Sequence, residues 1–175
     1  MHDKKVTILT TLALMGIISA ANAQAADTTI NITATVTAAS CTTKAPTSIP
    51  IDFSLNAADV ATADANSDWS SEATISLSGC PATTKSVDAV FSGTAVSGDT
   101  DGYQMKDSSN AAVSTGSIQL AKSDATLITS TKNTYTVNTV NNAAEFKVKA
   151  RMHSISGNIM PGVYTTAVDV TFAYH

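Results

Sequence analysis

Two cysteines and three histidines carry the most reactive side chains of this 175-residue chain. Cys41 and Cys80 are its only thiols, and they form no C-x-x-C redox motif. Structural zinc sites bring thiols together in close pairs, whereas these two are far apart in the sequence, so a shared metal is the weaker interpretation. A bond between the two sulfurs is the stronger one, provided that the chain reaches an oxidising compartment.

The histidines do not complete a catalytic set. His2 lies at the N-terminus, His153 lies in a strand-like pattern and His175 is the last residue. Nucleophilic catalysis needs Ser or Cys beside a His and an acid, and the spacing of the many Ser and Asp residues singles out no such group. Asp99, Asp101 and Asp107 are interpreted as solvated turn residues. We therefore expect no enzymatic activity, no cofactor and no bound metal.

The first 25 residues have the pattern of a secretory signal peptide. Lys4 and Lys5 form a basic start, and residues 6–19 are apolar but too short to span a bilayer. Small residues around Ala23 and Ala25 provide cleavage sites after either position. A retained membrane anchor is the less favoured alternative, because the apolar run lacks the length and the flanking aromatics of an anchor.

Export changes how the cysteines and the charge are interpreted. An oxidising compartment favours a Cys41–Cys80 disulfide, which closes a loop of about 40 residues and stabilises the fold by roughly 4 kcal/mol on the chain-entropy account. The mature chain would carry 8 basic and 13 acidic residues, a net charge of −5. Because it has no basic cluster, we expect no nucleic-acid partner.

The composition predicts an all-β domain. Charged residues make up 14% of the chain and aromatic residues 5%, whereas 27 Thr and 20 Ser supply the polarity, and such side chains suit a half-wetted sheet. Residues 28–38 alternate with hardly a break between a mainly apolar row and a polar row, which predicts a strand. Further strand candidates are 49–55, 73–77, 86–91, 117–120, 135–140, 145–153 and 163–174. Turn-forming stretches lie at 56–71, 97–102 and 107–110. Short strands separated by such turn-forming stretches predict an immunoglobulin-like β-sandwich.

The two most regular strands lie at opposite ends of the mature chain. The first carries the apolar row Ile30, Ile32, Ala34 and Val36, just before Cys41. The second follows Pro161-Gly162 and presents one face whose members are Tyr164, Thr166, Val168, Val170, Phe172 and Tyr174. From the alternation alone, either strand could be an ordinary edge of a closed sandwich.

Four features together resemble the subunits of chaperone-usher fimbriae, the type 1-like pilins. They are an N-terminal extension at residues 26–40, the Leu77-Ser78-Gly79-Cys80-Pro81 setting of the second cysteine, the strand that follows it at 87–93, and the closing pattern from Gly162 to the penultimate Tyr174. The resemblance covers essentially the whole mature chain. It implies a signal peptide at 1–25, a donor-strand extension at 26–40 and a pilin domain at 41–175.

The resemblance implies an immunoglobulin-like sandwich that lacks one strand. The gap would leave an apolar groove, filled first by a periplasmic chaperone and then by the extension of a neighbouring fimbrial subunit at the outer-membrane usher. The expected function is that of a structural subunit, exported via the periplasm to a fimbrium at the cell surface. Cell adhesion and any contact with a host surface would occur through the assembled fibre.

The carry-over assigns a role to individual residues. Ile30, Ile32, Ala34 and Val36 match the inserting row of the extension, although many relatives have a glycine where this chain has Ala34. Cys41 and Cys80 match the family disulfide. Six residues match the strand that lines the groove and is recognised by the chaperone: Gly162, Val168, Val170, Phe172, Tyr174 and His175. His175 departs from the frequent terminal Gln or Glu.

Several alternatives remain at this stage. A tip adhesin that binds a host receptor would carry an extra N-terminal domain, for which this chain has no room, and a small secreted hydrolase or inhibitor lacks a catalytic constellation. Trp69 could stack on a sugar, but a single Trp is more often a packing anchor. The sequence does not separate a shaft subunit from a minor or adaptor subunit.

Overall fold

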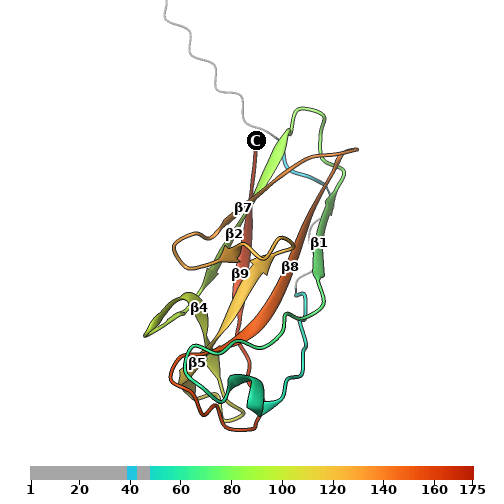
Figure 1. Ribbon diagram of the computed structural model, residues 1–175. Coiled ribbons are helices and arrows are strands. Elements are labelled where there is room, and N and C mark those ends of the chain that lie inside the picture. The colour runs from blue at the N-terminus through green and yellow to red at the C-terminus, as the bar shows by residue number, and fades with distance from the viewer. Residues whose placement is uncertain (1–38, 43–47) are drawn as a thin grey trace, which may run out of the picture. The chain divides into compact units, whose positions relative to one another are not determined.

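A computed structural model describes residues 39–42 and 48–175, all of which belong to one compact unit. They form two antiparallel β-sheets with a shared core (Figure 1). In chain order, the elements are the 3-10 turn η1 (Ala57–Val60) and strands β1 (Ala73–Ser78), β2 (Ser86–Gly93), β3 (Ala95–Val96), β4 (Asp99–Lys106), β5 (Ala112–Lys122), β6 (Leu127–Ile128), β7 (Thr134–Asn138), β8 (Ala143–Ser154) and β9 (Val168–Tyr174). The predicted all-β sandwich is confirmed. The predicted signal peptide and extension lie outside the described residues.

The larger sheet has the order β1-β8-β5-β4-β3, with β6 beside β5. Strand β8 is its longest member and alternates charged outward residues with apolar inward ones. The buried row runs from Ala144 to Ser154, and its largest members, Phe146 and Met152, are at most 6% exposed. Because β1 and β5 pair with the two edges of β8, its inward side chains have neighbours on both sides within the sheet.

The smaller sheet has the order β7-β2-β9. Its central strand β2 buries Val87, Ala89 and Phe91 against the larger sheet. One edge of β9 pairs with β2 in a register that runs from Val87 opposite Tyr174 to Gly93 opposite Val168. No strand among the described residues pairs with the second edge of β9.

Aromatic side chains join the two sheets. Phe146 of β8 meets Tyr135 of β7 edge-on at 5.3 Å between ring centroids, and it meets Phe172 of β9 at 5.7 Å. Tyr103 of β4 is fully buried, its hydroxyl has no hydrogen-bond partner among the described residues, and burial raises its pKa. The contact between Phe146 and Phe172 holds β9 on the core, although one edge of β9 has no neighbouring strand among the described residues.

The disulfide predicted from the two cysteines is present between Cys41 and Cys80. It ties the C-terminal end of the predicted extension to Cys80, two residues beyond the end of β1. Backbone bonds support this region, because the amide of Thr42 donates to Gly79 and the amide of Cys80 donates to Asn142. The left-handed φ of +65° at Gly79 makes a side chain unfavourable there.

Three of the predicted elements differ in the structure. Residues 49–55 were predicted to be a strand, but they join neither sheet. The last strand begins at Val168 rather than near Gly162, with one isolated bridge between Thr165 and Lys106 before it. The stretch 97–102 was predicted to be a loop, but residues from Asp99 onward form β4, because the side chain of Asp99 accepts a hydrogen bond from Ser117 of β5.

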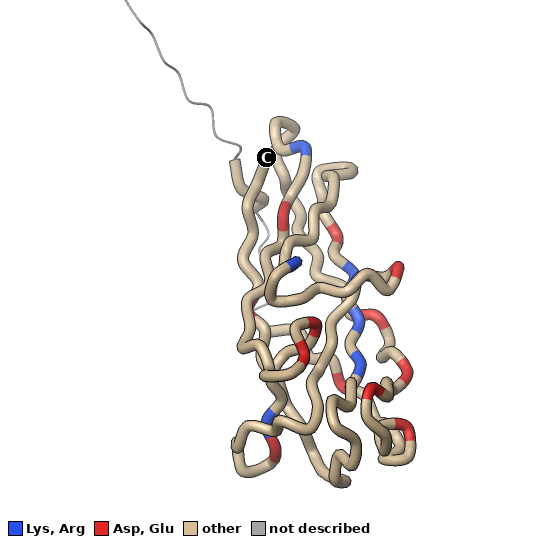
Figure 2. Tube along the Cα trace, turned by 60° about the vertical axis from the view of Figure 1, so that its left-hand side comes forward, with Lys and Arg blue, Asp and Glu red and all other residues tan. Residues whose placement is uncertain are grey.

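Few positions along the trace carry charge (Figure 2). A short basic row, Lys147, Lys149 and Arg151, lies on the outward face of β8. The ring centroid of Trp69 lies 4.4 Å from the guanidinium carbon of Arg151 and 5.4 Å from Nζ of Lys149, so Trp69 packs across this row. Across the described part of the chain, no helix has the length and apolarity needed to cross a membrane.

Candidate functional site

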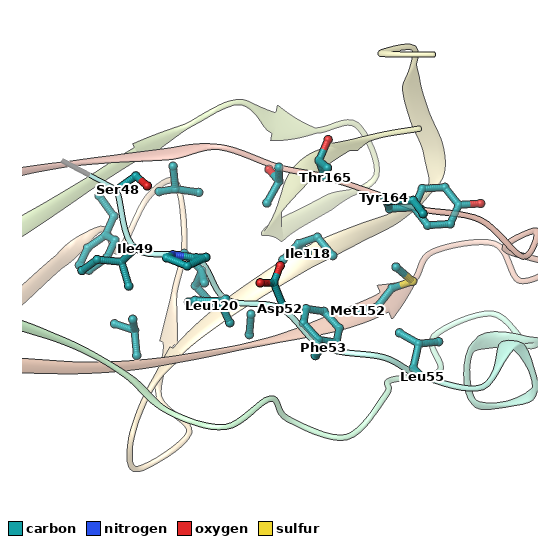
Figure 3. A pocket seen from close by; sticks show the side chains of 18 of the residues that line it. Ser48, Ile49, Asp52, Phe53, Leu55, Ile118, Leu120, Met152, Tyr164 and Thr165 are labelled. Carbon is teal, nitrogen blue, oxygen red and sulfur yellow. The ribbon is translucent and has the colours of Figure 1, made fainter. Parts of the chain in front are cut away.

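An apolar groove of about 1100 Å³ runs along the free edge of β9 (Figure 3). Residues 48–55 and strand β9 both line it. Ser48 and Ile49 lie at one end of the groove, and Leu55 and Tyr164 lie at the other. Since β9 leads away from Tyr164 to the C-terminus, the two lining segments run in opposite directions.

The β9 side of the groove consists of alternating half-buried side chains: Val168, Val170, Phe172 and Tyr174. The residues between them, such as Asp169 and Thr171, are exposed. Inward residues of a paired strand are normally covered by neighbours on both edges, but here one edge has no described strand beside it. The apolar face of β9 is therefore only half covered.

Residues 48–55 line the groove with the same alternation. Ile49, Ile51, Phe53 and Leu55 are half-buried and line the groove, whereas Ser48, Pro50, Asp52 and Ser54 are exposed. No backbone group of this segment is hydrogen-bonded to another described residue. The segment is thus an extended, amphipathic chain whose polar main-chain groups are available to a further strand.

The floor of the groove is the core of the sandwich itself. Its side chains come from both sheets and are buried by their packing, and they include Ile75, Leu77, Phe91, Ile118, Leu120, Val148 and Met152. The accessible apolar surface of the groove therefore belongs mainly to the half-buried rows on its two sides, which a monomeric domain ordinarily covers. The site can therefore receive an extended chain that supplies apolar side chains at every second residue.

The two ends of the groove differ. At the Tyr174 end, the carbonyl of His175 accepts hydrogen bonds from the amides of Lys85 and Ser86, and the imidazole Nε2 lies 3.2 Å from a carboxylate oxygen of Asp88. At the opposite end, Met160 and Val163 line the mouth of the groove, and both are largely exposed.

The structure gathers most of the predicted groove residues but not all of them. Val168, Val170, Phe172 and Tyr174 lie in one row on the groove. Gly162 lies at the mouth of the groove, outside β9, and His175 lies just beyond the opposite end. The inserting row Ile30, Ile32, Ala34 and Val36 lies outside the described residues. Sequence reasoning did not assign 49–55 to the groove, although its strict alternation was the available signal.

One polar cluster brings together residue types used in hydrolases. The Ser117 hydroxyl donates to Oδ2 of Asp99, and Nε2 of His153 lies 4.0 Å from that same oxygen. Nδ1 of His153 is 3.1 Å from Oδ1 of Asn66. The carboxylate stands between the hydroxyl and the imidazole, so the cluster joins β4, β5 and β8 without placing a base on the serine. In the described part of the chain, no cluster of three or more His, Cys, Asp or Glu side chains could hold a metal ion.

Known proteins share both the sequence and the fold. The chain is similar to Protein FimG of Escherichia coli (strain K12), with 31% identity over 167 residues, which cover 93% of this chain and 94% of that protein. Among solved structures, the P pilus rod subunit PapA has a TM-score of 0.58 at 14% identity, over 80% of this chain and 100% of PapA. No protein-family model matches the chain.

Two further solved structures have the same architecture. A chaperone-usher pilus structure has a TM-score of 0.57 at 15% identity, over 85% of this chain and 95% of its own. The CupB6 tip adhesin from Pseudomonas aeruginosa has a TM-score of 0.51 at 22% identity over 63% of this chain, and the match spans 31% of that adhesin. The sandwich in these structures confirms the predicted pilin-like fold.

Proposed function

Because the chain belongs to the family of chaperone-usher fimbrial subunits, we propose that it joins its neighbours by donor-strand exchange. It is a structural subunit of a fimbrium at the cell surface, and such subunits assemble with one another. The observation that carries the proposal is the open groove between residues 48–55 and β9. On both sides of the groove, every second residue is a half-buried apolar one, which is the spacing at which an inserted strand would present its own apolar side chains.

The predicted extension has the matching pattern. Ile30, Ile32, Ala34 and Val36 recur at every second position, and Thr or Asn lies between them. A strand with this pattern would direct its apolar row to the groove floor and its polar row to solvent. Full burial of two Ile and one Val stabilises the joint by roughly 5–8 kcal/mol before the cost of ordering.

The donated strand runs antiparallel to β9 in this proposal. Every ladder among the described strands is antiparallel, so a strand added beside β9 in the same sense extends the existing sheet. Its C-terminal end then lies at the Val168 end of the groove. The body of the donating subunit follows from that end.

Before assembly, the open groove requires a temporary occupant. Half-buried apolar rows beside an unpaired sheet edge favour aggregation. We assign this task to a periplasmic chaperone that pairs with β9 and contacts the C-terminal His175, followed by transfer at an outer-membrane usher. The export route through the periplasm rests on the signal-like residues 1–25.

The proposed role is structural rather than catalytic. In the cluster of Ser117, Asp99 and His153, the carboxylate separates the two groups that would have to exchange a proton. Adhesion would then be a property of the fibre, to which this subunit contributes length and joints.

The two faces of the extension provide a direct test. We expect Ile30→Ser combined with Ile32→Ser to abolish incorporation behind a partner subunit while chaperone binding is retained, because only the groove-facing row is altered. The matched control, Asn31→Ser combined with Thr33→Ser, should incorporate normally. Incorporation is measured as denaturant-resistant joined subunits in periplasmic extracts after coexpression with the chaperone. Equal incorporation of the two variants contradicts the donor assignment.

A further inference from the structure

Three large apolar side chains are strongly exposed in the described part of the chain, and they lie at its two ends. Val140 is 67% exposed, Met160 72% and Val163 69%. Val140 belongs to the β7–β8 hairpin, near the C-terminus, whereas residues 155–163 form a loop at the opposite end (Figure 1). The groove accounts for two of these residues at most, because Val140 does not line it.

The Val140 end is also where the extension leaves the domain. The Thr84 hydroxyl donates to the carbonyl of Ala39 at 2.7 Å, and the Thr139 hydroxyl donates to the carbonyl of Thr84 at 2.6 Å. Two hydrogen bonds therefore connect Ala39 to the residue beside Val140. The hairpin is held rigidly, because Val140 and Ala143 exchange two backbone bonds around Asn141 and Asn142, which have positive φ.

Met160 and Val163 lie at the other end of the domain, in the chain that leads into β9. Met160 and Val163 line the mouth of the groove, and the Tyr164 hydroxyl donates to the carbonyl of Met160. The loop is fastened to the body of the domain, since the amide of Asn158 donates to Ala61. Its apolar side chains are exposed although its backbone is anchored.

The direction of strand donation brings these two ends together. A strand antiparallel to β9 has its C-terminal end at the Val168 end of the groove, so Ala39 of the donor emerges next to Met160 and Val163 of the acceptor. Since Ala39 and Val140 are connected through Thr84 and Thr139, Val140 of the donor arrives at the same place.

We propose that each joint contains a second contact, in which Met160 and Val163 of one copy pack against Val140 of the next copy of this chain. This inference rests on the proposed donor-strand function. The contact is heterologous, because different surfaces of the two copies meet, and such a contact can repeat from copy to copy along an open fibre. It covers apolar surface that the inserted strand alone leaves at the end of the domain.

The experiment measures how fast joined pairs of the full mature chain separate in guanidinium chloride. The groove of the terminal copy is filled with a synthetic peptide of residues 26–38. We expect Val140→Ser and Met160→Ser each to speed separation about five- to tenfold. Because both variants remove the same contact, the double variant should separate no more than about twofold faster than either single one. Asn138→Ser, an exposed change two residues from Val140, is the control and should separate at the original rate.

Peptide release separates this inference from the proposed function. The peptide fills the groove but brings no Val140, so its release from Val140→Ser subunits should be unchanged. Rates for Val140→Ser that match the Asn138→Ser control, or single effects that multiply in the double variant, would overturn the second contact. If the peptide binds normally but two copies of the chain never form a joined pair, a second copy of this chain cannot be the partner. A peptide that does not bind the groove at all would instead overturn the donor-strand function.

Discussion

Strands β8 and β9 carry the same period-two alternation, but their inward side chains lie in different surroundings. The inward residues of β8 from Phe146 to Met152 are at most 6% exposed, whereas those of β9 from Val168 to Tyr174 are only half-buried. Strand β8 has a neighbour on each edge, and β9 has one described neighbour. Alternation therefore determines which way a side chain points, and the number of neighbours determines how far it is buried.

Residues 49–55 extend the comparison to a segment without any ladder. Ile49 and Phe53 face the groove and are half-buried, as in β9, yet no backbone bond to a described residue holds the segment in a sheet. Both sides of the groove thus combine a half-buried apolar row with backbone groups that no described residue bonds, as an edge strand does. A donated strand should make this region behave like β8, and the predictions below test that expectation.

The largest expected effect lies in the fully enclosed region. Replacing Phe146 with Ala should lower the free energy of unfolding by an amount near the upper end of about 3–5 kcal/mol, because the ring is completely buried against Tyr135 and Phe172. The loss should be nearly the same with the groove empty or filled by the 26–38 peptide. Denaturant unfolding of both forms measures it, with Lys147→Ala as the exposed control. If the stability loss of Phe146→Ala doubled when the peptide fills the groove, β8 would respond to the groove as β9 is expected to, and the distinction between the two strands would be wrong.

Removing the disulfide should have the next largest effect. A variant with Cys41→Ser and Cys80→Ser should lose roughly 4 kcal/mol of stability, because the unfolded chain regains the freedom of the closed loop. Residues 48–55 lie inside that loop and lack ladder bonds, so their cleavage by a protease should increase more than that of β8. Limited proteolysis with mass-spectrometric identification of the cut sites checks this. An equal increase in both regions would show that the groove side is not held by the disulfide.

Phe172 on β9 should respond to the state of the groove. We expect Phe172→Ala to cost about 1 kcal/mol when the groove is empty and about 3 kcal/mol when the peptide fills it, because filling completes the burial of the ring. Thr171→Ala, which faces solvent on the same strand, is the control. Unfolding with and without peptide gives both values. An unchanged cost would mean that the occupant does not cover β9.

The smallest effect is expected at Trp69, away from the groove. Trp69→Leu keeps an apolar side chain but removes the ring that lies against Lys149 and Arg151, so stability should fall by about 0.5–1 kcal/mol. The change should be independent of groove occupancy. Thermal unfolding at low and high salt measures it, and Ser71→Ala serves as control. A loss above about 2 kcal/mol would indicate packing beyond the cation–π contacts.

Local patterns in the sequence predicted most of the strands. The apolar rows of β2, β8 and β9 were recognisable because each faces a single core with strict alternation. The disulfide also followed from residues alone, since only two thiols are available. These features depend on a residue and its near neighbours, which a sequence displays directly.

Features that depend on distant contacts were missed. Strand β4 begins with Asp99, Asp101 and Gly102, which are typical of a turn, but Asp99 is buried by its bond to Ser117, and a side chain at Gly102 would meet both residues. Residues 49–55 alternate as a strand would but join neither sheet, and in the proposed function their pairing depends on a strand donated by another subunit. The groove is likewise a property of two segments more than a hundred positions apart, and neither segment reveals it alone.

The Cys41–Cys80 disulfide also determines how the subunit carries mechanical load. In a fibre joined as proposed, tension on the extension enters the domain at Ala39 and passes two residues later through a covalent bond to the end of β1. Tension that enters through the extension therefore bypasses the chain between the two cysteines, and residues 48–55 are loaded only through the donated strand that they help to hold. An oxidised subunit is therefore a short link that resists stretching, whereas reduction would put that stretch into the load path and allow the link to lengthen.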